Sequence, residues 1–404
     1  MFPSGTRKRP HTLTFVPEYR PARRDPSVHI QDLLLTHFRS YASLELAFSP
    51  AINCFTGPNG SGKTNILDAL HMLAFTRGFR SHQDQQVVQE GESFFLCQAL
   101  VIREDIPRRV ACNYIKGKGK RLLINQKPLP KLSEHIGSLP MVAILPQDGS
   151  LIDGPSAERR QFLDMLISQY DPRYLQHLIQ YGRLLAQRNA QLKLFGEQRY
   201  FDREQLQLWD EQLIPHGVAI QDGRSQFLEA YAPIFETYFR EMVSEKETPS
   251  LRYRPSIEAA TPEAWRAHFL RQEEKDRVNQ YTLSGIHRDD LIFRIDGHSV
   301  RNFGSQGQQK TFLIALKMAQ YDLLAQKTGL APVLLLDDLF DKLDPHRLSR
   351  IAQLLMTRIP GQVFITDTSY ERLSEIFGPE PAREVRYFAV QPGSVTPQKV
   401  SAGD

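Results

Sequence analysis

One glycine-rich segment, GPNGSGKT at residues 57–64, constrains the fold of this chain more than any other feature. A short apolar run precedes it, and apolar residues at helical spacing follow it, so the segment lies between an expected strand and an expected helix. In this setting the loop amides surround phosphate oxygens, a lysine neutralises them and a threonine hydroxyl contacts Mg²⁺. The sequence therefore predicts ATP and Mg²⁺ as ligands. The expected ligand-binding residues are Gly57, Pro58, Asn59, Gly60, Ser61, Gly62, Lys63 and Thr64, with Thr64 also on the metal.

A second motif is the apolar run 333–336, which two carboxylates follow directly. The run is typical of a buried parallel strand. Asp337, at the end of the strand, is expected to hold Mg²⁺, and Asp338 to orient or deprotonate the attacking water. An apolar strand that ends in acids is common and has no function by itself. Together with the glycine-rich loop, it favours a site that hydrolyses ATP.

The segment SQGQQ at residues 305–309 comes just before an expected helix. Ser305, Gly307 and Gln308 could form an anion site with the amides of the first helical turn. The same residues could equally be a polar loop with an ordinary helix cap. The choice depends on the kind of phosphate-binding protein to which the chain belongs.

The 404 residues suit about two domains, and no run approaches the ~20 apolar residues of a membrane helix. Three cysteines without metal-ligand spacing favour a reducing, cytoplasmic setting. The first and last thirds have α/β character, with a helical insertion between them. The expected divisions are a basic tail at 1–27, an ATPase lobe at 28–145 and 281–390, a helical lobe at 146–280, and a flexible tail at 391–404.

The net charge of +4 comes from the first 27 residues, so DNA binding by the remainder would need a local basic patch. That basic segment is either an extension without function or an arm that contacts DNA. Residues 103–131 hold nine basic and two acidic residues, around an expected hairpin tip. The tip is either a phosphate-contact stripe or simply a solvated turn. The candidate DNA contacts are Lys116, Lys118, Lys120 and Arg121, together with Arg159 and Arg160 at the start of a helix.

A histidine at position 287 is followed by an arginine and two aspartates. One histidine beside an arginine is a poor metal site. We therefore expect structural hydrogen bonds from this segment.

Taken in order, these motifs resemble the Walker A, signature and Walker B elements of ABC-type ATPases of the SMC/Rad50 kind, with Leu343 and Asp344 in the place of the D-loop. More specific stretches resemble the RecF family of bacterial DNA replication and repair proteins. The resemblance covers roughly residues 30–370. Those stretches are 38–41, 154–164, 187–189, 209–213, 285–291 and 305–310.

The resemblance implies an α/β ABC-type P-loop ATPase head with a helical second lobe. It also implies that two protomers enclose two ATP molecules, with Ser305, Gly307 and Gln308 of one protomer on the γ-phosphate bound by the other. Gln147 takes the Q-loop position. Asp367 stands where the family group usually has a histidine, so we expect weak hydrolysis. About 250 residues between Gly57 and Ser305 leave room for short helical arms but for no long coiled coil.

The function implied by the resemblance is ATP-dependent binding of gapped or single-strand/double-strand junction DNA, with RecO and RecR as partners in loading a recombinase. ATP would drive formation of a homodimer, and DNA would stimulate its slow hydrolysis. One alternative is another SMC-like or ABC-like ATPase that is not devoted to recombinase loading. A second alternative is an interaction module that hardly hydrolyses ATP.

Overall fold

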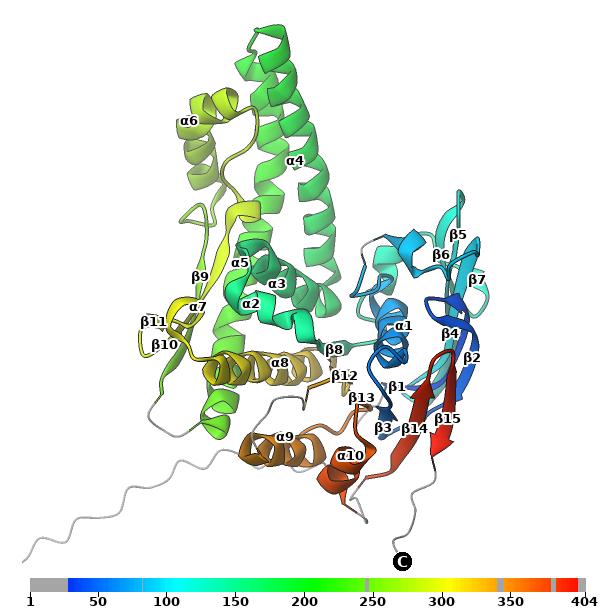
Figure 1. Cartoon of the computed structure of the whole chain (residues 1–404). Coiled ribbons are helices and arrows are strands. Elements are labelled where there is room, and N and C mark those ends of the chain that lie inside the picture. Colours follow the sequence, from blue (N-terminus) through cyan, green and yellow to red (C-terminus); the bar gives the residue numbers. More distant parts are fainter. Residues whose placement is uncertain (1–27, 82, 244–246, 340–344, 379–382, 399–404) are drawn as a thin grey trace, which may run out of the picture.

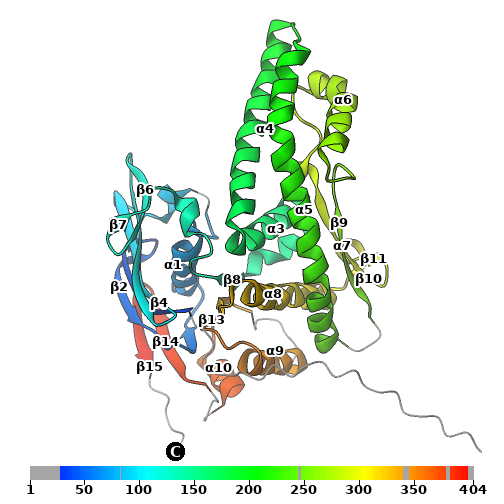
Figure 2. The same ribbon diagram turned by 180° about the vertical axis from the view of Figure 1, so that it is seen from behind.

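The computed structural model describes residues 28–81, 83–243, 247–339, 345–378 and 383–398. Two sheets with a helix between them form one lobe, and long helices form a second lobe beside it (Figure 1). The view from behind shows the same division (Figure 2). Residues 1–27, the expected D-loop positions 343–344 and part of the expected C-terminal tail lie outside the described residues.

The central sheet of the first lobe carries the strands on which the predicted motifs end. Its strand order is β15-β14-β3-β13-β12-β8, and all neighbours except β15 and β14 run parallel. Strands β3, β12 and β13 are buried along their whole length, which explains their continuous apolar runs. The bounds are β3 Ile52–Thr56, β8 Met141–Ile144, β12 Val333–Asp337, β13 Val363–Asp367, β14 Val385–Gln391 and β15 Ser394–Gln398.

The second sheet is antiparallel, with the order β2-β1-β4-β5-β6-β7. Helix α1 (Lys63–Phe75) packs between the two sheets and is buried at all but one of its positions. This position fixes the helix that follows the glycine-rich loop. The strands are β1 Val28–Phe38, β2 Tyr41–Ala47, β4 Phe94–Arg103, β5 Ile106–Ile115, β6 Gly119–Ile124 and β7 Lys127–Pro128, and the short helices are η1 Asp84–Val87 and η2 Leu132–His135.

The second lobe is built on an antiparallel pair of helices, α4 (Pro172–Gln198) and α5 (Arg203–Met242). The side chains of Asp171 and Asp202 accept hydrogen bonds from backbone amides in the first turn of α4 and α5, respectively, so each helix has a defined start. The compact helices expected here are in fact longer, since α5 continues for 40 residues past two internal prolines. The pair still extends only ~40 Å, as the 27 residues of α4 predict, so the described chain has no long coiled coil.

A three-stranded sheet, β11-β10-β9, packs beside α5. It crosses the expected domain boundary at residue 280, because β9 precedes this residue and the other two strands follow it. The expected flexible tail at 391–404 is wrong for residues 394–398, which pair with β14 as β15. The bounds are β9 Pro249–Arg254, β10 Asp290–Ile295, β11 His298–Ser299, η3 Pro146–Gly149, α2 Ser150–Asp153, α3 Ser156–Tyr170, α6 Pro262–Asn279 and η4 Ile286–Arg288.

Helix α8 (Gln306–Thr328) joins the two lobes, because it contacts both β8 and α5. The Tyr231 hydroxyl of α5 donates a hydrogen bond of 2.6 Å to the Leu316 carbonyl oxygen of α8. The Phe235 and Phe312 ring centroids, also from α5 and α8, lie 4.7 Å apart. The remaining helices are α7 Val300–Phe303, α9 Pro345–Thr357 and α10 Tyr370–Phe377.

Candidate nucleotide-binding site

The glycine-rich loop connects the end of β3 to the start of α1. A Cβ atom at Gly57 would lie 2.2 Å from the Val390 carbonyl oxygen. Gly62 has a φ of 111°, and a Cβ there would lie 2.7 Å from the Tyr41 hydroxyl oxygen. Both positions therefore require glycine, because a Cβ atom would be too close to a neighbouring oxygen. At Gly62 the positive φ also favours glycine. The expected strand, loop and helix are all present.

Lys63 lies in the first turn of α1 and is almost wholly buried. Its Nζ donates hydrogen bonds of 2.8 Å to the Gly57 carbonyl oxygen and 3.0 Å to the Pro58 carbonyl oxygen. The ammonium group is thus held against the loop at the positive end of a helix. A phosphate group bound in this loop would meet both the helix dipole and a fixed positive charge.

Thr64 and Asp337 meet although they are 273 positions apart. The Thr64 hydroxyl donates a hydrogen bond of 3.0 Å to Asp337 Oδ1, and the Thr366 hydroxyl donates one of 2.7 Å to the same oxygen. Burial raises the pKa of Asp337, while hydrogen bonds from Thr366 and Thr64 oppose that shift. A hydroxyl and a carboxylate fit Mg²⁺, which prefers oxygen ligands.

Asp338 turns away from the β12 direction, with a φ of 46°, and its N–H donates a hydrogen bond of 3.0 Å to the Thr366 hydroxyl oxygen. It lines a cavity of about 440 Å³ together with Gln306 and Lys310 of α8. The expected catalytic Gln147 lies exposed in η3, between Pro146 and Gly149, which do line this cavity. Asp338 and the Gln147 segment thus flank one cavity.

The SQGQQ segment forms the start of α8. The Ser305 Oγ accepts from the Gln308 N–H at 3.2 Å, and the Gln308 Oε1 accepts from the Ser305 N–H at 2.8 Å. This reciprocal pair is a capping box. Ser305 is exposed, and Figure 1 shows the start of α8 beside α7, on the far side of the molecule from α1. Gly307 and Gln308 lie in the same first turn, partly exposed.

Further polar residues, which the sequence motifs did not predict, lie around the loop. The Arg80 guanidinium donates a hydrogen bond of 3.1 Å to Asn65 Oδ1 and is close enough to Asp337 to lower its pKa, against the larger effect of burial. Buried Asp68 accepts a hydrogen bond of 2.6 Å from Arg39 Nε. Only Arg39 had a signal, within the 38–41 stretch. Asp367, expected at the switch position, accepts from the Ser369 N–H at 2.8 Å and caps the following turn.

The predicted basic hairpin exists, as β5 and β6 pair up to Ile115 and Gly119. The lysines do not form one extended stripe, because Lys116 and Lys118 lie in the turn between the strands. Both are exposed, as is Arg121. Lys120 instead donates a hydrogen bond of 2.7 Å to Asp84 Oδ1, so its charge is already paired.

Arg159 was expected as a DNA contact, and the structure contradicts this. Its guanidinium is buried and forms a paired contact with Asp290, with Nε 2.7 Å from Oδ1. A further hydrogen bond of 3.1 Å joins it to the Gly154 carbonyl oxygen. Arg160 is partly buried; it donates to Ser156 Oγ at 2.8 Å and to the Asp289 carbonyl oxygen at 2.7 Å, and it lines an open cavity. The pattern of two basic residues could not show that the fold buries Arg159.

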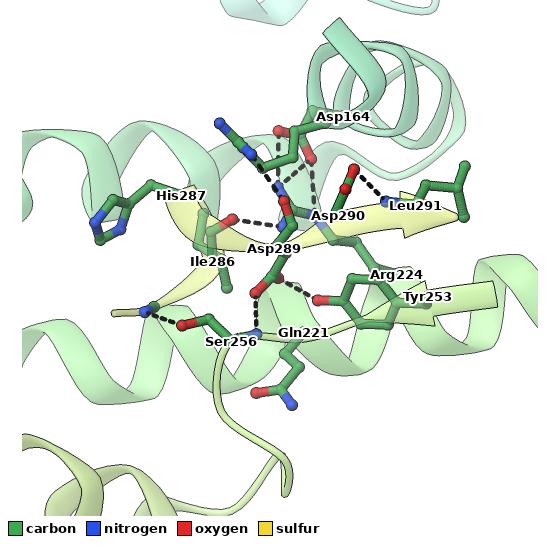
Figure 3. A network of polar contacts seen from close by, with 12 residues as sticks. Asp164, Gln221, Arg224, Tyr253, Ser256, Ile286, His287, Asp289, Asp290 and Leu291 are labelled. Atoms are coloured by element: carbon green, nitrogen blue, oxygen red, sulfur yellow. Dashed lines mark hydrogen bonds and ion pairs between the residues drawn. The ribbon is translucent and has the colours of Figure 1, made fainter. Parts of the chain in front are cut away.

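Segment 285–291 is the centre of a buried polar network (Figure 3). Arg224 of α5 pairs with Asp164 of α3 at 2.9 Å and with Asp289 at 2.8 Å. The Tyr253 hydroxyl also donates to Asp289. Burial lowers the pKa of His287 to about 4, so this histidine is neutral at physiological pH. The expectation of structural hydrogen bonding is confirmed. The described residues hold no cluster of three or more metal-ligating side chains.

No helix in the described part of the chain is both long and apolar enough to cross a membrane. A family model described as "RecF/RecN/SMC N terminal domain" matches residues 29–378. DNA replication and repair protein RecF of Flavobacterium johnsoniae is 41% identical over 351 residues, which cover 86% of this chain and 96% of the relative. The RecF of Cytophaga hutchinsonii is 39% identical over 369 residues, which cover 91% and 96% of the two chains.

Solved structures agree with these relatives. The recombination mediator protein RecF-ATP of the RecFOR pathway superposes with a TM-score of 0.85 at 26% identity, covering 94% of this chain and all of that one. The Smc head domain from Pyrococcus furiosus, at 17% identity and a TM-score of 0.54, shares the fold over 92% of this chain and 96% of that one. The predicted ABC-type ATPase head with a helical second lobe is therefore confirmed. The chain belongs to the RecF family of DNA replication and repair proteins.

Proposed function

We propose that the chain is an ATP-controlled DNA-binding protein of replication and recombinational repair. The observation that carries this proposal is the 3.0 Å hydrogen bond between Thr64 and Asp337, which joins the glycine-rich loop to the acidic strand. This contact brings together the hydroxyl and the carboxylate that would hold Mg²⁺ on ATP. The ATP named with a RecF structure of the same fold supports the same ligand.

The position of Ser305 supports a site shared between two protomers. Ser305 is exposed at the start of α8, away from the helix that begins at Lys63 (Figure 1). Ser305, Gly307 and Gln308 therefore serve the nucleotide of a second copy, and ATP acts as the ligand that joins the copies. In this assembly Asp338 orients or deprotonates the attacking water, with Gln147 beside it. Hydrolysis is weak and resets the assembly.

A Ser305→Arg substitution tests the shared site. The added side chain stands at the exposed helix start, so it should block the second copy while binding of ATP to the chain's own loop is unchanged. Analytical ultracentrifugation with ATP and Mg²⁺ should show dimers for the wild type and monomers for the variant. Ser394→Arg, at an exposed position in β15, is the matched control and should still form dimers. A Ser305→Arg protein that forms dimers like the wild type would exclude this arrangement.

The exposed hairpin tip is the proposed phosphate contact for DNA. Replacing Lys116, Lys118 and Arg121 together by glutamine removes three exposed positive charges. We expect weaker binding of gapped DNA. The slope of log K against log[salt] should be less steep by roughly 2–3 units, because a variant that contacts fewer phosphates displaces fewer counterions from the DNA when it binds. Fluorescence anisotropy at several salt concentrations measures this slope. Lys120→Gln, at the lysine paired with Asp84, should change the slope little. Equal slopes for the triple variant and the wild type would show that the hairpin does not contact the DNA phosphates.

The proposal has four further parts. They are recombinase loading, a preference for gapped or junction DNA, RecO-type and RecR-type partners, and a cytoplasmic location. The RecFOR pathway named with the solved RecF structures supports the partners. Another SMC-like ATPase role is the second candidate. Sedimentation with gapped DNA separates the two, since the first predicts an ATP-dependent complex with that DNA.

A further inference from the structure

A cavity between the lobes contains none of the predicted nucleotide-site residues. It has a volume of about 600 Å³, in the range of small-molecule sites. Phe75 and Arg77, at and just beyond the end of α1, line it from the first lobe, and residues of α3 and α4 line it from the second. Figure 1 shows α1 facing these helices. The cavity thus lies at the opposite end of the helix that begins with Lys63.

Two arginines that line this cavity, Arg77 and Arg160, form no direct ion pair with a described carboxylate, although the charges of Asp289, Asp290 and Asp164 partly oppose the effect of burial on the pKa of Arg160. The Arg160 guanidinium donates to a hydroxyl and to a backbone carbonyl, and Arg77 Nη2 contacts only the Met165 sulfur, at 3.6 Å. No ion pair of either arginine occurs among the described residues. Burial lowers the pKa of both groups, which means that their surroundings disfavour the charge. An anion that enters the cavity would relieve this cost.

The nearby carboxylate of Asp164 cannot supply the missing charge. Both of its oxygens accept hydrogen bonds from Arg224, at 2.9 and 3.0 Å, and one also accepts from the Tyr174 hydroxyl. His287 is neutral near pH 7, since burial lowers its pKa to about 4. Arg77 and Arg160 thus bring two guanidinium groups to the cavity wall, and Asp164 pairs with Arg224 rather than with either of them.

The rest of the wall is mainly apolar, with a few polar groups. Leu175, Leu178 and Leu185 of α4 lie opposite Phe75 and Met165. Gln161, also in the wall, has an exposed amide that makes no hydrogen bond with any described residue. An apolar wall suits a base and its sugar, a free amide suits a base edge, and guanidinium groups suit a phosphate.

We propose that this cavity between the lobes is a second nucleotide site, which takes a single nucleoside phosphate. Arg77 and Arg160 hold the phosphate, and the apolar wall of α4 covers the base. The nucleotide is either a residue of bound DNA or a free nucleotide. That the nucleotide belongs to bound DNA rests on the proposed function, whereas the existence of the site does not.

The test uses the full chain with Lys63→Met, so that the glycine-rich loop does not take the probe. Isothermal titration calorimetry with dTMP should show saturable binding, and thymidine or inorganic phosphate alone should bind at least about tenfold more weakly. Arg77→Gln should weaken dTMP binding by about tenfold or more. Arg173→Gln, an exposed arginine on α4 outside the cavity, should leave dTMP binding unchanged.

A second variant acts by volume rather than by charge. Gly182 lines the cavity, and a Cβ there meets no atom within 4 Å, so Gly182→Phe fills the space without a clash at the backbone. It should abolish dTMP binding, while Gly182→Ala retains it. Displacement of dTMP by gapped DNA assigns the site to DNA, and failure of displacement assigns it to free nucleotides.

The proposal is overturned if dTMP shows no saturable binding, or if Arg77→Gln and Arg173→Gln bind it alike. A second measurement separates this proposal from the proposed function. It is the binding of gapped DNA, by fluorescence anisotropy, to a Gly182→Phe protein that retains Lys63. DNA binding at the wild-type level, together with no dTMP site, would remove the cavity proposal alone. If the wild-type protein bound dTMP but no DNA, the proposed function would be contradicted and the cavity proposal would not.

Discussion

Replacing Lys63 by methionine is expected to abolish ATP binding. The Lys63 ammonium group is held by two carbonyl oxygens of the loop, at 2.8 and 3.0 Å, and would neutralise the phosphates. Methionine has nearly the same length but no charge, so the buried space stays filled while the charge-assisted hydrogen bonds that Lys63 would donate to the phosphates are lost. Those bonds contribute about 1.5–3 kcal/mol each, so we expect a loss of at least about a hundredfold in affinity. Calorimetric titration with ATP and Mg²⁺ measures it.

Asp338→Asn is the contrasting variant for that experiment. Asp338 follows the strand that ends in Asp337 and lies beside the Thr366 hydroxyl, outside the glycine-rich loop. ATP binding should therefore be unchanged, while steady-state turnover falls and ATP-joined dimers last longer. Thermal unfolding without ATP checks that the Lys63→Met protein is folded, since this variant also loses the two hydrogen bonds to the loop. Tight ATP binding by a folded Lys63→Met protein would contradict the role of the loop.

Replacing Arg224 by methionine is expected to cause the largest loss of stability. Arg224 is 1% exposed, and its guanidinium holds Asp164, Asp289 and the Ile286 carbonyl oxygen together. Methionine removes the charge and leaves two carboxylates without their cation. Breaking one partner of a buried pair costs about 3–5 kcal/mol. Urea denaturation should show this difference, and Arg173→Gln on the protein surface should show almost none.

The effect of pH gives this prediction a second readout. Burial already raises the pKa of Asp289, and Arg224 opposes that shift. Without Arg224 the folded-state pKa of Asp289 rises further above its unfolded-state value. The variant then binds a proton more tightly when folded, so its stability deficit is greatest at neutral pH and narrows as the pH falls through the raised pKa. A deficit that does not change with pH would show that lost packing, rather than uncompensated charge, dominates.

The parts of the fold that depend on local pattern could be predicted from the sequence. The apolar runs at 52–55 and 333–336 became buried strands, because parallel strands covered on both faces need continuous apolar residues. Residues 57–62 became the loop before α1, and Lys63 and Thr64 its first turn, because the glycines allow the required backbone positions. Ser305 caps α8 as its sequence position indicated, because its partner Gln308 is only three residues away. These features depend on neighbours within a few residues.

Features that depend on distant partners could not be predicted. Arg159 and Lys116 look alike in the sequence, yet one is buried against Asp290 and the other is exposed in a turn. The spatial relation of Arg80 to Asp337 also had no sequence signal, since 257 positions separate them along the chain. The length of α5 was underestimated because the sequence sustains no heptad pattern there, whereas packing against α4 and α8 keeps the helix continuous past two prolines.

The strand order around the glycine-rich loop has a consequence for the growing polypeptide on the ribosome. Strand β3 ends at Thr56, but the strands hydrogen-bonded to it on its two sides are β13 and β14, which begin only at Val363 and Val385. The strand that carries the loop therefore stays unpaired in its sheet until most of the chain has been translated. A chain terminated before Val363 lacks both strands that pair with β3, so the strand that positions the phosphate site has no neighbour to hold it in the sheet.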